Sequence, residues 1–128
     1  MKSDSVYLAG FMAFTFVLIT VVLIAVDWAG ANGRLRRNQW AGIRTPSTMR
    51  SDLAWAAGHR AALRLTPLHL LTLVVLLIAL WITVRRSPTM GVVNVVGIGG
   101  ALVFVLVALF TALIAGRAAK AADDHREY

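Results

Sequence analysis

The side chains best suited to binding chemistry gather in one stretch of the sequence, residues 38–60. Arg44 is followed by Thr45 and Pro46, and its guanidinium group can hold a carboxylate or a phosphate through paired N–H donors, which a lysine cannot reproduce. Trp55 and His59 are four residues apart, so they share one face of a helix. We therefore predict that binding residues lie here, namely Asn38, Gly42, Arg44, Thr45, Pro46, Trp55, His59 and Arg60.

Patterns typical of catalysis or metal binding are scarce. The absence of cysteine excludes disulfides, thiolate metal sites and cysteine nucleophiles. His59, His69 and His125 lie far apart and lack the spacing of metal ligands. The glycines of residues 97–100 lie within an apolar run and lack the dinucleotide-binding fingerprint. We expect a non-enzymatic protein without metal or cofactor, and an enzyme acting on lipid headgroups ranks as the third alternative.

The elements that must position these residues are apolar helices. Of the 128 residues 59% are hydrophobic and only 15% charged, whereas a soluble domain carries about 25% charged residues. Three uncharged stretches exceed the roughly 18 residues of a membrane-spanning helix. The sequence predicts an all-α, three-span transmembrane bundle forming a single membrane domain over residues 1–128, with spans at 6–26, 65–84 and 92–115.

A cleaved signal peptide is the main alternative for the first span, because Ala29, Gly30 and Ala31 resemble a cleavage site. The apolar run is longer than the 7–15 residues of a signal peptide's hydrophobic region, so we predict a retained anchor. The second and third spans begin at Thr66-Pro67 and Ser87-Pro88, which fit a helix cap followed by proline at the first helical position. Their short connection predicts a tight antiparallel hairpin.

The loop of residues 27–64 is the segment long enough to hold a site outside the bilayer. Gly42 to Thr48 should form a structured turn, because Gly42 permits unusual backbone geometry and Pro46 keeps Thr45 extended. Ser51 is a plausible N-cap for a short helix over 53–65, with Asp52 at its positive end and a break at Pro67.

Two interpretations of this short helix remain open. In the first, the helix lies in the headgroup region. Trp55 then anchors it at the interface, His59 has its hydrogen bonds satisfied by neighbouring polar groups, and the arginines reach lipid phosphates. In the second, Asn38, Arg44, Thr45, His59 and Arg60 line a polar pocket at the cytoplasmic mouth of the bundle.

The distribution of charge predicts the orientation. The first loop carries seven arginines and, with Asp27 and Asp52, a net charge of +5, and the tail of residues 117–128 adds three basic residues. Three spans place these ten on one side and only Lys2, Arg85 and Arg86 on the other. Because positive loops stay in the cytoplasm, we predict a multi-pass membrane protein with its N-terminus outside and its C-terminus in the cytoplasm.

The same basic loop should attract anionic lipid headgroups. Nucleic acid is not expected as a partner, because aromatic residues do not interleave with the basic ones and no binding module is recognisable. Within the spans, His69 lies one turn inside the second and should reach the interface, whereas Asp27 could pair with a loop arginine. Small residues in the third span (Gly97, Ala101, Ala108, Ala112 and Gly116) allow close helix packing, and we expect a membrane-protein partner or homo-oligomer.

The loop resembles the signature of the SdpI family of bacterial membrane proteins. The matches are Asn38, Gly42-Ile43-Arg44-Thr45-Pro46, Thr48, Ser51, Trp55 and His59-Arg60, with departures at Ser47 and Gly58. The resemblance covers about a quarter of the chain and the order of spans around it, and the namesake is longer.

The resemblance implies a protein of the bacterial inner membrane that gives immunity to a secreted membrane-active peptide, or relays a signal through capture of a transcriptional repressor. No repressor-docking domain is evident after Gly116. The alternative function is that of a small accessory subunit stabilising a larger membrane complex.

Overall fold

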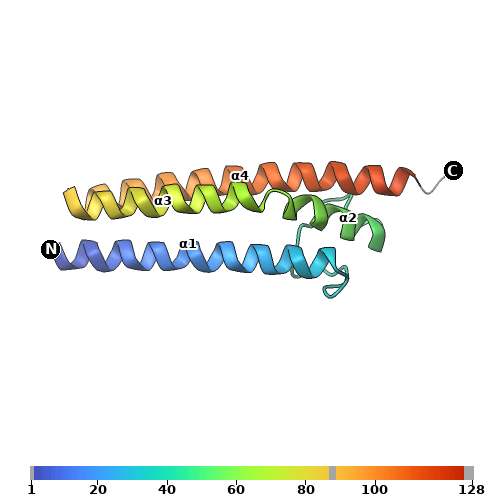
Figure 1. Cartoon of the computed structure of the whole chain (residues 1–128), viewed down its shortest axis with the longest axis horizontal. Helices are drawn as coiled ribbons and strands as arrows, with labels where there is room; N and C mark the ends of the chain where they lie inside the picture. The colour runs from blue at the N-terminus through green and yellow to red at the C-terminus, as the bar shows by residue number, and fades with distance from the viewer. Residues whose placement is uncertain (1, 87–88, 126–128) are drawn as a thin grey trace. The chain divides into compact units, whose positions relative to one another are not determined.

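Four helices make up most of the chain in the computed structural model, which describes residues 2–86 and 89–125 (Figure 1). They are α1 (Lys2–Ala31), α2 (Asp52–Leu63), α3 (Thr66–Arg86) and α4 (Met90–Asp124). These two ranges contain no strand. The expected all-α fold is therefore confirmed.

Three of the helices, at Ser3–Ala31, Thr66–Arg86 and Met90–Asp124, are long and apolar enough to cross a membrane. The first and the third contain their predicted spans and extend beyond both ends, whereas the second begins one residue after the predicted start at 65 and ends two residues after the predicted end at 84. The largest difference is at the C-terminal end, because the predicted tail that begins at residue 117 is helical as far as Asp124. α3 begins at Thr66, one residue earlier than its predicted cap implies, and Ser87-Pro88 lies outside the described residues.

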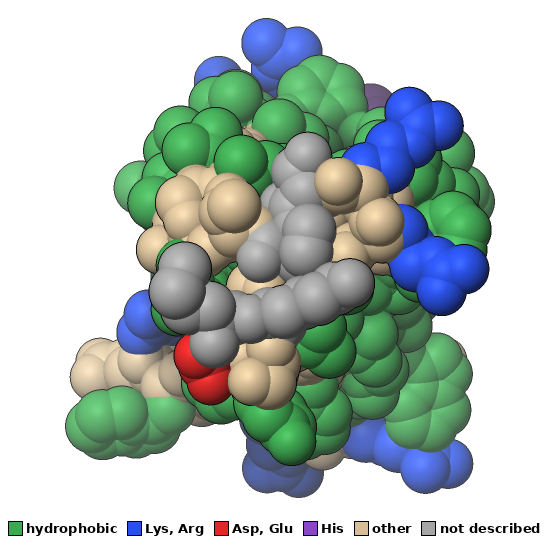
Figure 2. All heavy atoms as spheres, turned by 90° about the vertical axis from the view of Figure 1, so that its left-hand side faces the viewer, with side chains coloured by type: hydrophobic (Ala, Val, Ile, Leu, Met, Phe, Trp, Pro, Cys, Tyr) green, Lys and Arg blue, Asp and Glu red, His purple; other side chains and the backbone are tan. Residues whose placement is uncertain are grey.

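Hydrophobic side chains cover most of the surface seen from the end where α1 begins (Figure 2). Many large ones point outward, among them Phe11, Leu71, Leu102 and Val95, which is 72% exposed. Exposure of such a surface to water is unfavourable, whereas its contact with lipid tails is not. The exposed apolar side chains are therefore what a chain with three spanning helices requires.

Hydroxyl groups within these helices are satisfied locally. Thr15, Thr20, Thr72 and Thr83 each donate a hydrogen bond of 2.8–2.9 Å to the carbonyl four residues earlier in the same helix. This arrangement pairs the hydroxyl without a partner from another helix. It allows threonine to occur in an apolar span at little cost.

The chain divides into two compact units, and α1 and α4 contribute to both. The first unit comprises Met1–Thr20 and Leu68–Val107. Its core joins the rings of Phe16 and Phe104, whose centroids lie 6.0 Å apart, and the ring of His69 lies 5.9 Å from Phe104. His69 is buried. The expectation that it reaches the interface is wrong, because its ring packs against an aromatic side chain of α4.

Glycine permits close helix packing in this first unit. A side chain at Gly97 would collide with Met12 of α1, and one at Gly100 would collide with Leu76 of α3. The small residues of α4 therefore meet the other two spans of the same chain. The contact between Leu76 and Gly100 also agrees with the predicted pairing of α3 with α4.

The second unit comprises Val21–Pro67 and Ala108–Tyr128 and contains the loop and α2. Ser51 caps α2 as predicted, with extended backbone and a side-chain oxygen that accepts from the Ala54 N–H at 3.1 Å. α2 ends at Leu63, because Pro67 has no N–H and its ring would clash with the carbonyl of that residue in a continuous helix.

Candidate functional site

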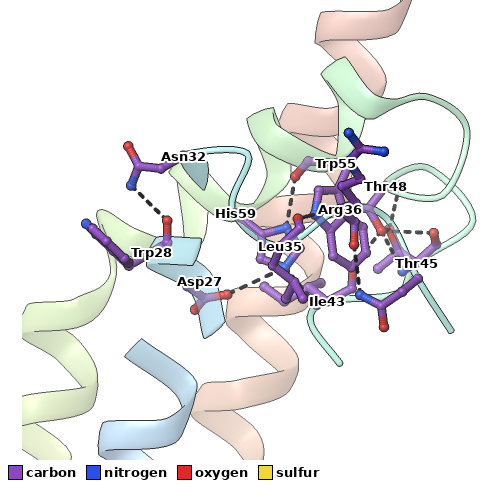
Figure 3. A network of polar contacts seen from close by, with 11 residues as sticks. Asp27, Trp28, Asn32, Leu35, Arg36, Ile43, Thr45, Thr48, Trp55 and His59 are labelled. Carbon is purple, nitrogen blue, oxygen red and sulfur yellow. Dashed lines mark hydrogen bonds and ion pairs between the residues drawn. The ribbon is translucent and has the colours of Figure 1, made fainter. Parts of the chain in front are cut away.

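His59 lies at the centre of the loop unit and is fully buried. Its Nε2 accepts a hydrogen bond from the Ile43 N–H at 3.1 Å, and its Nδ1 lies 2.9 Å from the Trp55 carbonyl oxygen (Figure 3). An acceptor Nε2 and a donor Nδ1 define one neutral tautomer. Burial lowers the pKa of His59 below its ordinary value of 6.5, and the bond to the Trp55 carbonyl offsets part of that effect.

Two glycines make room for this imidazole. A Cβ atom at Gly30, near the end of α1, would lie 2.6 Å from His59 Cδ2. A Cβ atom at Gly42 would lie 2.7 Å from both His59 Nε2 and Trp55 Cη2. Gly42 also has a φ of +101°, which L side chains rarely adopt. Its predicted role as a turn residue is confirmed, and glycine is required there for two independent reasons.

Trp55 packs beside His59 with ring centroids 4.3 Å apart and only 2% of its surface exposed. Its indole N–H donates to the Leu35 carbonyl oxygen at 2.9 Å. The shared face of Trp55 and His59 was predicted correctly. The interpretation of Trp55 as an interfacial anchor is wrong, because this face of α2 is turned into the protein and joins the helix to the loop.

Thr45 and Thr48 close the turn that contains Pro46. The Thr45 N–H donates to Thr48 Oγ1 at 2.9 Å, and the Thr48 N–H donates to Thr45 Oγ1 at 3.1 Å. Thr48 Oγ1 then donates to the Ile43 carbonyl at 2.7 Å. Thr48 is fully buried, so it is a central residue of the turn that was not among the predicted binding residues. Pro46 is exposed.

Asn38 shapes the other half of the loop. Its Oδ1 accepts from the N–H groups of Trp40 and Ala41, both at 2.8 Å, and its Nδ2 donates to the Arg36 carbonyl at 2.9 Å. These three bonds all go to the loop's own backbone. Asn38 therefore holds the backbone in shape.

Arg44 and Arg60 are the charged members of the predicted set, and like Pro46 they are exposed. Arg44 Nη1 donates to the Gln39 carbonyl, and Arg60 Nη1 donates to the Ala31 carbonyl at 3.4 Å. A guanidinium group has five N–H donors, so one bond to a carbonyl fixes its position and leaves others for an anion. The predicted set thus divides into residues that build the loop and two arginines at its surface.

This division alters the predicted polar pocket. His59 lies inside the loop unit, where the rings of Trp55 and His59 fill the space themselves. Arg44 and Arg60 lie at the surface. An anion would meet the arginines from the solvent side and would not reach the imidazole.

The C-terminal part of α4 supports this unit. Ser51 Oγ donates to Asp123 Oδ1 at 2.8 Å, so an acid 72 residues away stabilises the cap of α2. A Cβ atom at Gly58 would lie 3.2 Å from the Ala115 carbonyl and 2.7 Å from Thr48 Cγ2. α2 therefore approaches α4 closely at Gly58. Asp123 was not predicted from the sequence. The feature that could have indicated it is an acidic residue in the helical extension of the third span.

Asp27 of α1 faces the same centre. Its Oδ1 lies 3.9 Å from His59 Nε2, and its side chain is largely buried. The carboxylate was expected to meet a loop arginine, but it points toward the imidazole (Figure 3). Arg37 pairs instead with Asp52, the first residue of α2, at 3.5 Å. In the part of the chain that the structure describes, no group of three or more His, Asp or Glu side chains could hold a metal ion.

Comparison with known proteins identifies one family. The model of the SdpI/YfhL protein family matches residues 34–116, a range that includes the whole loop network from Leu35 to Arg60 and most of α3 and α4. No curated protein and no solved structure matches the chain.

Proposed function

Because this chain belongs to the SdpI/YfhL protein family and has three helices able to cross a membrane, we propose that it is a non-enzymatic binding protein of the bacterial inner membrane. In this proposal it gives resistance to a membrane-active peptide or relays the peptide's presence. One observation carries the proposal. The buried residues of the family signature are used to fold the loop, and Arg44 and Arg60 remain exposed on this scaffold.

The exposed arginines suit an anionic group better than a catalytic reaction. A guanidinium group binds a carboxylate or a phosphate through two parallel bonds. The imidazole, the usual acid or base at neutral pH, is enclosed and has both nitrogens in use. Binding of a carboxylate or phosphate on the peptide or on a partner is therefore the proposed event.

Exchange of Arg44 for lysine tests this proposal. Lysine keeps the charge but offers no paired donors, so Arg44→Lys should weaken binding about 10- to 100-fold, the value of one strong charge-assisted contact. The readout is survival of sensitive bacteria that express the chain and are exposed to secreted membrane-active peptides. Expression and melting temperature should stay at the unmodified level. Full protection by the lysine variant would mean that Arg44 contributes only its positive charge, which helps to set the topology, and is not a binding residue.

The proposed orientation places the N-terminus outside and both the loop and the C-terminus in the cytoplasm. The aromatic residues support a membrane location, because Arg34 stacks over Trp28 at 4.6 Å and Arg85 over Trp81 at 5.8 Å, near the ends of α1 and α3. Tryptophan and arginine collect at the interface of a bilayer.

Single cysteines test the orientation in a chain that has none of its own. Gln39→Cys on the loop and Thr89→Cys between α3 and α4 both place a thiol at an exposed position. An impermeant maleimide added to intact cells should label position 89 and not position 39. Labelling of position 39 alone would reverse the topology.

An accessory subunit of a larger membrane complex is the second candidate. It is favoured by Gly10, Gly91 and Gly99, where a Cβ atom would meet nothing within 4 Å beyond the local backbone, which leaves room for a partner helix or a second copy. Purification in a gentle detergent followed by mass spectrometry separates the two functions. One stoichiometric large partner supports the subunit, and its absence supports the binding protein.

A further inference from the structure

Trp40 is the most exposed large hydrophobic side chain of the described chain, with 91% of its surface accessible. The other exposed tryptophans, Trp28 and Trp81, lie on helices that can cross a membrane, whereas Trp40 lies on the loop between α1 and α2. Burial of an indole is strongly favourable, so its complete exposure calls for an explanation.

The loop holds Trp40 in this position. The backbone N–H of Trp40 donates a hydrogen bond to Asn38 Oδ1 at 2.8 Å, and the carbonyl of the preceding Gln39 accepts one from Arg44. Gly42, two residues later, is fixed against Trp55 and His59. The backbone on both sides of the indole is thus held by hydrogen bonds within the loop, and the ring itself is exposed.

The surroundings of Trp40 are strongly basic. Residues 32–51 contain five arginines and no acid. Arg36 and Arg44 are exposed and stand four residues on either side of the indole, whereas Arg37, also exposed, is paired with Asp52 at 3.5 Å. An exposed indole between arginines matches the composition that proteins use at the headgroup level of a bilayer.

We propose that Trp40, Arg36 and Arg44 form a membrane-surface anchor that binds the phosphates of anionic lipids in the bilayer crossed by the chain's own helices. Lipid fits better than a soluble acidic partner because α1 ends only nine residues before Trp40, which limits their separation to about 30 Å even in a fully extended chain. The indole inserts among the headgroups, and the arginines hold phosphate through charge-assisted bonds. This role shares Arg44 with the proposed function, whereas Trp40 and Arg36 belong to the anchor alone and are therefore the residues that test it.

The test uses tryptophan fluorescence of the full chain in lipid nanodiscs. Trp28→Phe and Trp81→Phe leave Trp40 as the exposed emitter and Trp55 as a buried internal reference. The discs contain phosphatidylcholine alone or a mixture with phosphatidylglycerol. In the mixture, we expect less quenching of Trp40 by acrylamide, a shorter emission wavelength, and quenching by lipids brominated near the headgroup. Trp40→Phe in the same background should remove all three responses.

Matched arginine variants identify the source of the lipid preference. Arg36→Gln should weaken the preference for phosphatidylglycerol about fivefold, the usual effect of one arginine at a membrane surface. Arg117→Gln, an exposed arginine of α4, should leave it unchanged. Equal acrylamide quenching of Trp40 in both kinds of disc would overturn the proposal. Protection that appears only when an acidic polypeptide is added would overturn it as well.

Discussion

Replacing Trp55 with alanine should lower the free energy of unfolding by about 3–5 kcal/mol, the usual cost of emptying a buried aromatic site. The indole is almost fully enclosed, contacts the His59 ring and donates to the Leu35 carbonyl. Its removal leaves a cavity between α2 and the loop and an unpaired carbonyl. The loss should appear as a lower melting temperature and as faster proteolysis of residues 32–51.

A second tryptophan provides the control for this experiment. Trp81 is 64% exposed on α3, so Trp81→Ala should change the stability by no more than about 0.5 kcal/mol. Both variants are compared in one neutral detergent, by thermal unfolding. If Trp55→Ala costs no more than Trp81→Ala, the indole does not hold the loop to α2.

Acidification should destabilise the chain through His59. Because burial lowers the pKa of this imidazole, the unfolded state binds more protons than the folded state just below the ordinary pKa of 6.5. The stabilisation is therefore complete above about pH 6.5 and declines as the pH falls below it. Protonation also places a hydrogen on Nε2, which can then no longer accept from the Ile43 N–H.

Two variants assign this pH dependence. His59→Leu should cost about 1–3 kcal/mol at neutral pH because the Ile43 N–H loses its partner, and its stability should no longer follow the titration of residue 59. Asp27, the acid that faces the imidazole from α1, is tested by Asp27→Asn, which should keep the pH dependence. Thermal unfolding between about pH 7.5 and pH 5 measures both. If the pH dependence of stability disappears in Asp27→Asn but persists in His59→Leu, it arises from the Asp27 carboxyl group and not from the His59 imidazole.

The spans could be predicted from sequence because hydropathy is a local property. An uncharged run such as 6–26 implies a spanning helix whatever its neighbours are, and α1 contains that run. The ends were less predictable, since α4 continues to Asp124 past the charged Arg117 and Lys120. Charge ends a hydrophobic run but does not end a helix, because lysine and arginine are good helix formers.

The local chemistry of the loop was also accessible. Ser51 as the cap of α2, Gly42 as a turn residue and the shared face of Trp55 and His59 follow from rules that span four residues or fewer. The direction of that face does not follow from them. It depends on the Leu35 carbonyl, the Ile43 N–H and the backbone of Gly30, which come together only when the chain folds.

The same reason explains the residues that were missed or misplaced. Asp123 reaches Ser51 across 72 residues of sequence, and His69 meets Phe104 of another helix. Composition shows that such groups exist but does not show which of them meet. The division of the signature into a buried network and exposed arginines therefore became visible only in three dimensions.

The most direct measurement of this division is nitrogen NMR of the imidazole of His59 in the full chain, recorded as the pH is lowered. A buried scaffold residue should keep its proton on Nδ1 and leave Nε2 unprotonated, with a coupling to the Ile43 amide, and should titrate below its ordinary pKa of 6.5. The Arg44→Lys variant should give the same spectrum, because that arginine lies at the surface. An imidazole that exchanges between both tautomers and titrates at or above 6.5 would place His59 in solvent and contradict the buried network.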